Sequence, residues 1–409
     1  MDSQKPVGKY FVLALTIVFF AVTVSAPIVS LLSLDIAKTY FPESFSAGSS
    51  QAAQNAAVGA VTQIATINSA FEVVFALIMS LVAVRLKHKS LLLIGVILVF
   101  ISAAGSYLAP NLLTLQVFFG LEGAGTIMVA IMGYTLVGEF LPFSKKAKTV
   151  SYLIATTALV TLVAAPPIFL ISSFGGWRLN FLLLVLPVSL FGLLFAFFAL
   201  PHEPNTELIT AGKNVYLTGF KKIFKNRSAA SCLIGGMLAG ATAVGTFALA
   251  FYRQQLGLPL GYASVIMMIA ASMYVVASLV IGRFVNRIGA RILVIVAAFG
   301  NGIFMAIFFF MPSWWIALPL DMVHVWFGAA TFTAFQCLIL DQVPEHRPTV
   351  LSLRSIFGNL GAAIGAALGG AMLILFGSYQ AVGVAFGVIS FAAAGAFLMT
   401  KDTTKTSTL

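Results

Sequence analysis

Long apolar runs separated by short polar segments extend along almost the whole chain. Twelve such runs are found, at 10–34, 60–84, 90–109, 112–138, 149–173, 179–200, 229–252, 261–283, 291–311, 314–340, 350–375 and 381–399. A helix needs about 20 apolar residues to cross a bilayer, and a backbone in hydrocarbon must satisfy its own hydrogen bonds. The pattern therefore predicts an all-α membrane protein with twelve transmembrane helices.

Composition agrees with this pattern. The 409 residues are 60% hydrophobic and 9% charged, against roughly 25% charged in an average soluble protein. This excludes a water-soluble globular domain. The first run lacks a small-residue cleavage site and precedes eleven others, so we expect a retained span rather than a removed signal peptide.

The positive charges predict the orientation of the chain. If alternate loops face opposite sides, Lys38, Arg178 and Arg253 fall on one side and the other 20 of the 23 lysine and arginine residues on the opposite side. By the positive-inside rule, both termini are cytoplasmic in a plasma (inner) membrane. The net charge of +11 then reflects topology and contact with lipid headgroups rather than nucleic-acid binding.

An internal repeat divides the chain into two halves. With a constant offset of 202 residues, Pro110 matches Pro312 and Lys89 matches Arg291. We predict six-helix bundles at 1–200 and 228–409, joined by a cytoplasmic linker at 201–227. Two parallel repeats predict a pseudo-twofold axis along the membrane normal, a site between the halves and transport by alternating access.

One cytoplasmic loop carries a family motif. The sequence from 282 to 291, GRFVNRIGAR, resembles the G-x-x-x-D/N-R-x-G-x-R/K loop of the major facilitator superfamily. The motif residues, which we expect to form a cytoplasmic gating loop, are Gly282, Arg283, Asn286, Arg287, Gly289 and Arg291. The copy in the first half keeps only Arg85 and Lys89. Gly176-Trp177-Arg178 also resembles a family motif, and overall the chain looks most like the drug-proton antiporter branch.

Four ionisable residues lie within the predicted spans: Glu72, Glu122, Asp321 and His324. A charge at this depth costs at least about 2.5 kcal/mol, which makes such residues functional candidates by default. The repeat makes Glu122 and His324 equivalent. The resemblance implies that their two helices line the central cavity.

We predict that these residues couple proton movement to transport. Asp321 and His324 are three residues apart and share a helical face, so the carboxylate can stabilise the imidazolium. Protonation of Glu122 would remove a charge whose burial opposes a conformational change. The alternatives are a static Asp321–His324 pair and a Glu122 that bonds a hydroxyl of a neighbouring helix. Glu72 is the weaker candidate, because its helix mainly forms the interface between halves in the family.

Two further features have open interpretations. Arg354, one turn inside its span, is either a contact for an anionic substrate or a snorkelling side chain. Gly361, Gly365 and Gly369 form a small-residue face that favours close helix packing.

Enzyme and cofactor chemistry find no support in the sequence. Cys232 and Cys337 lie in apolar runs and predict neither a disulfide framework nor a metal site. We find no nucleophilic triad and no phosphate-binding glycine loop, so we expect no enzyme activity, cofactor or metal.

The leading hypothesis is a monomeric secondary transporter that exports small organic or amphipathic compounds in exchange for protons. Its partners would be that substrate, protons and membrane lipids. Proton symport of a small organic solute or anion is one alternative. A channel or non-transporting receptor on the same fold is another.

Overall fold

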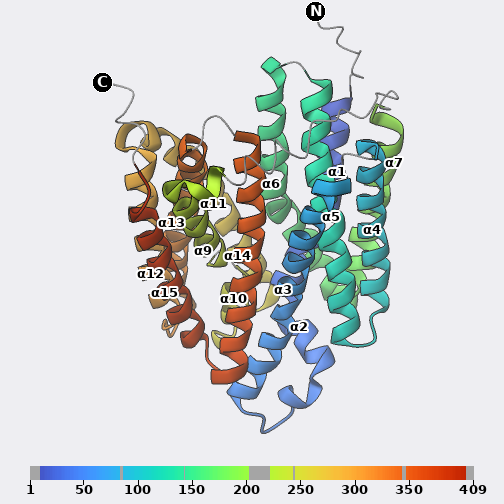
Figure 1. Ribbon diagram of the computed structural model, residues 1–409. Helices are drawn as coiled ribbons and strands as arrows, with labels where there is room; N and C mark the ends of the chain where they lie inside the picture. Colours follow the sequence, from blue (N-terminus) through green and yellow to red (C-terminus); the bar gives the residue numbers. More distant parts are fainter. Residues whose placement is uncertain are drawn as a thin grey trace, which may run out of the picture. The chain divides into compact units, whose positions relative to one another are not determined.

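The structure is a computed structural model that describes residues 10–82, 86–141, 143–201, 222–242, 245–342 and 347–401. These residues form helices joined by short connections, as the hydropathy pattern predicts (Figure 1). Eleven helices of the described part are long and apolar enough to cross a membrane. The remaining predicted span, 149–173, lies within α6, whose apolar part is Leu159–Gly175. The chain is thus an all-helical, multi-pass membrane protein.

Two compact units make up the fold. Unit 1 comprises Met1–Tyr40 and Ile67–Ile209, and unit 2 comprises Phe41–Thr66 and Thr210–Leu409. The boundary passes through helix α3, so 41–66 pack with the second unit, whereas the repeat assigns them to the first half. The division into 1–200, 201–227 and 228–409 stays a prediction about the domains, and much of its linker lies outside the described residues.

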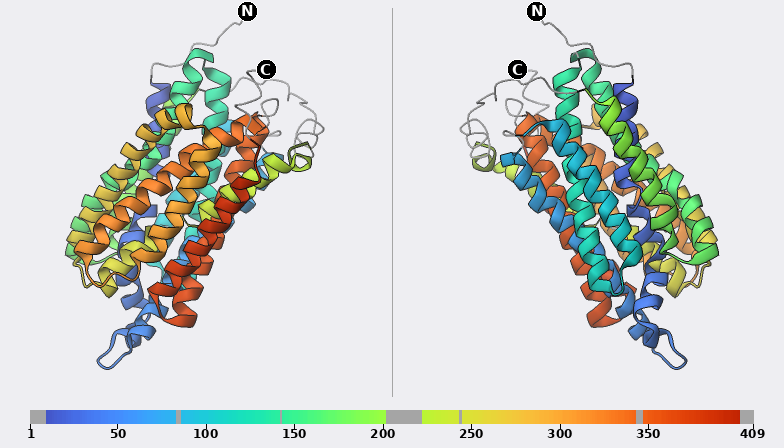
Figure 2. Two further views of the ribbon diagram at one scale, coloured as in Figure 1. Left: turned by 90° about the vertical axis from the view of Figure 1, so that its left-hand side faces the viewer. Right: turned by 90° about the vertical axis from the view of Figure 1, so that its right-hand side faces the viewer.

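The helices of the first half are α1 (Phe11–Thr23), α2 (Ala26–Tyr40), the short 3₁₀ helix η1 (Pro42–Phe45), α3 (Gln51–Val82), α4 (His88–Leu108), α5 (Leu112–Phe140), α6 (Phe143–Gly175), the π-helical turn η2 (Phe181–Val185) and α7 (Leu186–Ala199). The best-packed pairs in unit 1 are α4 with α5 and α1 with α7. The right-hand view of Figure 2 shows α4 and α5 side by side.

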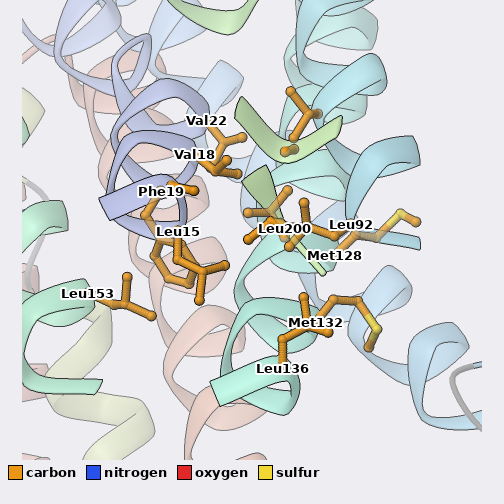
Figure 3. Packing of buried hydrophobic residues seen from close by; sticks show 14 of the residues in the cluster. Leu15, Val18, Phe19, Val22, Leu92, Met128, Met132, Leu136, Leu153 and Leu200 are labelled. Atoms are coloured by element: carbon orange, nitrogen blue, oxygen red, sulfur yellow. The ribbon is translucent and has the colours of Figure 1, made fainter. Parts of the chain in front are cut away.

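Apolar side chains fill the space between these helices. Leu15 and Val18 of α1 lie with Met128 and Met132 of α5 in one buried cluster, which Leu200 joins from the end of α7 (Figure 3). Lipid is as apolar as these side chains, so close van der Waals packing, rather than exclusion from water, holds the helices together.

The helices of the second half are α9 (Arg227–Ala241), α10 (Gly245–Ala250), the π-helical turn η3 (Phe251–Gln255), α11 (Leu260–Ile288), α12 (Ala290–Phe308), α13 (Trp314–Gln342), α14 (Arg347–Phe376) and α15 (Tyr379–Leu398). Helix α12 packs against both α13 and α15, and the left-hand view of Figure 2 shows these helices side by side.

The predicted small-residue face is a packing surface. A Cβ added at Gly361 would lie 2.0 Å from the Met237 carbonyl oxygen, and one at Gly365 would lie 1.9 Å from that of Ala241. Glycine therefore allows the backbones of α14 and α9 to approach closely.

Helix α3 begins at Gln51, nine residues before the predicted start of the second span at 60. Its first turns are too polar to be recognised by hydropathy, but their side chains find partners within unit 2. Asn55 donates to the Gly377 carbonyl at 2.7 Å, and Gln63 donates to that of Ala367 at 3.3 Å. Contacts to backbone carbonyls thus stabilise a polar helix where the sequence predicted a loop.

Candidate functional site

The first membrane helix is broken near its middle. Helix α1 ends at Thr23 and α2 begins at Ala26, and Pro27 follows with no N–H to continue the helical ladder. Ser25, which lies in the break, is 2% exposed. A break at this depth leaves backbone carbonyls that need other donors, because hydrocarbon offers none.

Helix α5 supplies the side chains that meet this break. The Thr126 hydroxyl donates to the Val22 carbonyl at 2.9 Å. One turn earlier on α5, the Glu122 carboxylate accepts a hydrogen bond from the Ser25 hydroxyl, and Glu122 is only 4% exposed. Glu122 therefore makes the contact that the second alternative predicted, a bond to a hydroxyl of a neighbouring helix. Its role in proton coupling stays a prediction.

The side chains around Glu122 pack closely and leave no water-sized cavity. The residues that surround this point are Ser25, Val99, Ser102, Ala103, Glu122, Phe181 and Val185. Phe181 and Val185 belong to the π-helical turn η2, in which the Leu186 N–H donates to the Phe181 carbonyl. Pro187 follows at once and lacks an N–H, which explains the local change from the α-helical pattern.

Glu72 lies near Glu122 because α3 approaches α5 closely in unit 1. Gly123 has no side chain, and a Cβ there would lie 2.3 Å from the Asn68 carbonyl oxygen. The Asn68 amide donates to the Phe119 carbonyl at 2.8 Å. One turn along α3, Glu72 interacts electrostatically with Glu122, so the structure brings together two of the predicted candidates.

Unit 2 holds the other two candidates. On α13, His324 Nδ1 lies 3.5 Å from Asp321 Oδ1, and their side chains are 15% and 6% exposed. This distance favours attraction when the histidine is charged but exceeds a good hydrogen bond. The predicted common face of the helix is present, and the pair lies largely inside the unit.

Sequence reasoning missed a third group beside this pair. Tyr252, on the π-helical turn η3, is 0% exposed, and its hydroxyl lies near Asp321. The hydroxyl forms no well-aligned hydrogen bond with the described residues. A phenol near the end of an apolar span, followed directly by Arg253, was the available signal.

In unit 2, helix α9 ends at Ala241, and Thr242 is its C-cap. Here the neighbouring side chain is neutral. Asn301 of α12 donates to the Thr242 hydroxyl at 3.3 Å and to the Ser390 hydroxyl at 3.1 Å. The sequence did not single out this buried cluster, because asparagine, threonine and serine carry no charge that marks them in a hydropathy profile.

Arg354 lies among aromatic rings. Its guanidinium carbon lies 4.9 Å from the centre of the Phe332 ring and 6.0 Å from that of Phe335, and it interacts electrostatically with Tyr274. Cation–π contacts of this kind stabilise a guanidinium inside a membrane protein. The structure therefore places Arg354 within unit 2, and its predicted contact with an anion stays a prediction.

Two of the predicted gating-loop residues bind the ends of helices. Lys89 Nζ donates to the carbonyls of Phe197 at 2.8 Å and Leu200 at 2.6 Å. Its repeat equivalent Arg291 donates to the Leu398 carbonyl at 2.7 Å. A cation at a helix C-terminus satisfies free carbonyls and interacts favourably with the helix dipole.

Most of the predicted gating loop is helical, which corrects the prediction: Gly282, Arg283, Asn286 and Arg287 lie in the last turns of α11, and only Gly289 separates α11 from α12. Gly289 has φ +93°, which favours glycine. Gly282 is partly buried, whereas Arg283 and Arg287 are exposed. Arg85 and the side chain of Asn286 lie outside the described residues.

The Gly-Trp-Arg sequence ties three connections of unit 1 together. Trp177 Nε1 donates to the Thr39 hydroxyl at 3.0 Å, and Arg178 Nη2 donates to the Ala109 carbonyl at 2.9 Å. Tyr40 donates to the same carbonyl at 3.0 Å. These bonds explain the Gly-Trp-Arg motif as a structural feature of unit 1.

Among the described residues, no group of three or more histidine, cysteine, aspartate or glutamate side chains could hold a metal ion.

The comparisons with known proteins agree with this arrangement of helices. A family model described as Major Facilitator Superfamily matches residues 11–274 and 240–409. The chain belongs to the Major Facilitator Superfamily. It is accordingly a secondary transporter, and this family is one of transporters rather than enzymes.

Solved structures share the fold of this superfamily member. A D-xylose-proton symporter matches with a TM-score of 0.78 and 15% identity, over 96% of this chain and 98% of its own. A bacterial homolog of the human lysosomal transporter Spinster, inward-facing and unoccupied, gives 0.73 and 16%, over 98% of both chains. A mutant of the nucleoside transporter NupG gives 0.72 and 17%, over 96% and 100%. At these identities the similarity shows the fold alone.

Proposed function

We propose that this transporter couples substrate movement to protons by alternating access, with Glu122 as the principal proton carrier. The observation that carries the proposal is the contact of a buried carboxylate with the break in the first membrane helix. A charge at this depth is expensive, and this one bonds the residue at which the helix is interrupted. The protonation state of Glu122 would therefore directly affect the hydrogen bond at the helix break.

The proton would act through the hydrogen bond to Ser25. An ionised Glu122 accepts from the Ser25 hydroxyl, whereas a protonated Glu122 is neutral and needs that donor less. Proton binding would lower the cost of excluding water from the carboxyl group and favour a state in which the helices close around it. A ligand shifts such an equilibrium only through its different affinity for the two states.

Asp321 and His324 form the second proton-carrying group in the proposal, and Glu72 an auxiliary one. Asp321 and His324 are mostly buried within unit 2, and histidine changes charge near physiological pH. Glu72 interacts with Glu122, and two nearby carboxylates disfavour simultaneous ionisation.

For direction and substrate, we propose efflux of small organic or amphipathic compounds, as in the drug-proton antiporter branch. The aromatic content of 12% and the low charge suit such substrates. Proton symport of a small organic solute or anion is the second candidate. One protein of the same fold is a D-xylose-proton symporter, and Arg354 offers a cation for a carboxylate.

For location, we propose a monomer in a plasma (inner) membrane with both termini in the cytoplasm. The support is the bias of lysine and arginine toward one set of loops. Cysteine labelling of single-cysteine variants at Lys38 and Lys401 in intact cells would test the orientation. Labelling of the first position alone by a membrane-impermeant maleimide is expected, and the reverse pattern would contradict it.

The test of the coupling proposal uses purified full-length protein in liposomes that contain a pH-sensitive dye. The probes are ethidium as an amphipathic cation, D-xylose as a neutral solute and gluconate as an anion. We expect proton movement with one class of probe and its loss in Glu122→Gln and His324→Ala. Glu43→Gln, at an exposed residue, is the matched control and should behave as the unmodified protein.

The direction of proton movement separates the candidates. Exchange of ethidium for protons supports efflux, whereas co-movement of protons with D-xylose or gluconate supports symport. Transport that is unaffected by a pH gradient and by both substitutions would contradict proton coupling. Conductance far above the turnover of a carrier would instead support a channel, and binding without transport would support a receptor.

A further inference from the structure

The side chain of Arg354 points into the membrane part of unit 2 and not toward the surface at which its helix begins. Four residues join α13 to α14, so the end of α13 at Gln342 and the start of α14 at Arg347 lie at the same surface. The Arg354 guanidinium carbon lies 4.9 Å from the centre of the Phe332 ring and 6.0 Å from that of Phe335. It is therefore nearer to the ring that lies one turn deeper on α13.

This orientation is not that of a snorkelling side chain. Arg354 follows the start of α14 by seven residues, whereas Phe332 precedes the end of α13 by ten residues. These separations correspond to depths of about 10 Å and about 15 Å along the two helices. A snorkelling arginine turns its charge toward the interface, whereas this guanidinium reaches deeper than its own backbone.

The pair of Arg354 and Phe332 has one open side. Phe332 is 45% exposed, whereas Phe335, the other ring beside the guanidinium, is 4% exposed. Arg354 itself is partly buried. Charged side chains at membrane depth almost always face the interior of the helix bundle or a water-filled space. The open side of this pair therefore faces water and not lipid.

This open side continues one turn further along α14. Among the described residues, a Cβ added at Gly358 would meet no heavy atom within 4 Å apart from its chain neighbours and the backbone of its own helix. The next residue, Asn359, is partly buried, and its amide forms no hydrogen bond with the described residues. Such an amide needs water or a ligand. Arg354, Gly358 and Asn359 lie within about 140° of the helix circumference, so they face one space.

The two side chains differ in what they can bind. A guanidinium has five donors in a planar fork that matches a carboxylate, so contacts within the unit leave others for a ligand. The exposed part of the Phe332 ring offers a surface against which a second aromatic ring packs well.

We propose that Arg354 and Phe332 form a substrate subsite for aromatic carboxylates. The guanidinium would bind the carboxylate, and the ring of the ligand would pack against Phe332, with its far edge over Gly358. This inference rests on the proposed transport function and names its substrate class. Such compounds are small, organic and amphipathic, so the class suits both efflux and symport.

The test measures binding and needs no proton movement. Radiolabelled benzoate is equilibrated by dialysis against the purified full-length protein in detergent. Benzamide has the same shape without the charge, and cyclohexanecarboxylate has the charge without the aromatic ring. We expect benzoate to bind, and benzamide to compete at least about tenfold more weakly, because it loses the charge-assisted hydrogen bonds. Cyclohexanecarboxylate should compete about fivefold more weakly, because it loses the aromatic contact.

Variants of the arginine assign the carboxylate contact. Arg354→Gln should weaken benzoate binding at least about tenfold and leave the weak binding of benzamide unchanged. Arg354→Lys keeps the charge without the planar fork, so its affinity for benzoate should lie between the two. Arg227→Gln, at an exposed arginine of unit 2, is the matched control and should bind benzoate as the unmodified protein does.

A variant of the phenylalanine assigns the ring contact. Phe332→Leu should weaken benzoate binding about fivefold and leave cyclohexanecarboxylate binding nearly unchanged, a difference that general disturbance of the fold would not produce. Phe310→Leu, at a phenylalanine of unit 2 that is 54% exposed, is the matched control.

The outcomes separate this subsite from the function on which it rests. The subsite is overturned if benzoate does not bind, if benzamide competes equally well, or if Arg354→Gln binds benzoate unchanged, and proton coupling at Glu122 is unaffected by these results. Benzoate binding that requires Arg354, in a protein that moves no protons with benzoate in the liposome assay, supports the subsite and contradicts proton coupling.

Discussion

Each unit has a helix end with a buried polar residue, Ser25 after α1 and Thr242 after α9, and the two residues face different chemistry. In unit 1 the break at Ser25 faces an acid, Glu122 of α5. In unit 2 the C-cap of α9, Thr242, faces a neutral amide, Asn301 of α12. Both partners are buried, at 4% exposure each, so the difference is one of charge and not of exposure.

In the proposed mechanism, this difference separates a helix end whose partner can bind a proton from one whose partner cannot. A carboxylate changes charge with pH, whereas an amide does not. In unit 2 the titratable groups lie instead on α13, where Asp321 and His324 are paired beside the π-helical turn. The repeat relates Glu122 to His324, yet their contacts differ: Glu122 bonds the helix break, and His324 faces a carboxylate on its own helix.

The largest effect is expected when the amide of Asn301 in unit 2 is replaced by an acid. In Asn301→Asp, a carboxylate would face two hydroxyls that already donate elsewhere, Thr242 to Ala239 and Ser390 to Ala298. Burial without donors disfavours the ionised form. We expect a loss of about 3 kcal/mol of stability at pH 8 and a much smaller loss at pH 5, measured as thermal unfolding midpoints in detergent.

The direction of this pH dependence follows from the linkage between proton binding and folding. The carboxyl group of Asn301→Asp binds its proton more tightly in the folded state, so the stability of the folded state falls as the pH rises. The control is Asn111→Asp, the same chemical change at the exposed N-cap of α5, where a carboxylate caps equally well. Equal stability of Asn301→Asp at both pH values would show that the end of α9 in unit 2 accommodates a charge as readily as the break in unit 1.

Removing the donor in unit 1 is the next strongest test. In Ser25→Ala, the Glu122 carboxylate loses its hydroxyl donor. The protonated form is then favoured, and we expect the pH dependence of proton-linked transport in liposomes to move upward by about one unit. This would show that the contact at the break tunes the acid.

Thr126→Val serves as its matched control, because it removes a neutral bond from the same break. A loss of about 1 kcal/mol in stability with an unchanged pH profile is expected. If both substitutions shift the profile equally, the shift comes from disturbance of the helix break and not from the bond to Glu122.

The sequence predicted much of this arrangement, for identifiable reasons. Hydropathy depends on side-chain composition, so it located the spans and showed that Glu122, Asp321 and His324 lie within them. The small-residue face of α14 was also recognised, because its spacing of four is visible in the letters and its packing against α9 is confirmed.

What the sequence could not predict depends on the backbone and on distant partners. The break at Ser25 becomes evident only when Thr126 and Glu122 satisfy it, and these residues follow about 100 positions later. The π-helical turn that places Tyr252 is stabilised by aromatic rings from α12 and α15. The polar start of α3 needs the carbonyls of a helix about 300 residues away.

The smallest predicted effect is the difference between the two cations that bind helix ends. Lys89 is 5% exposed and bonds two carbonyls of unit 1, whereas Arg291 bonds one carbonyl at a more exposed position in unit 2. Lys89→Met would leave two carbonyls with fewer donors, so we expect a loss of about 1–2 kcal/mol. Arg291→Met should cost about half as much, because water reaches the Leu398 carbonyl that it binds.

The stability of both variants is measured as the midpoint of thermal unfolding in detergent. The double variant should show the sum, since separate contacts act independently. An equal cost for both single variants would mean that burial does not distinguish these caps, and that the repeat, rather than the local environment, determines what each cation contributes.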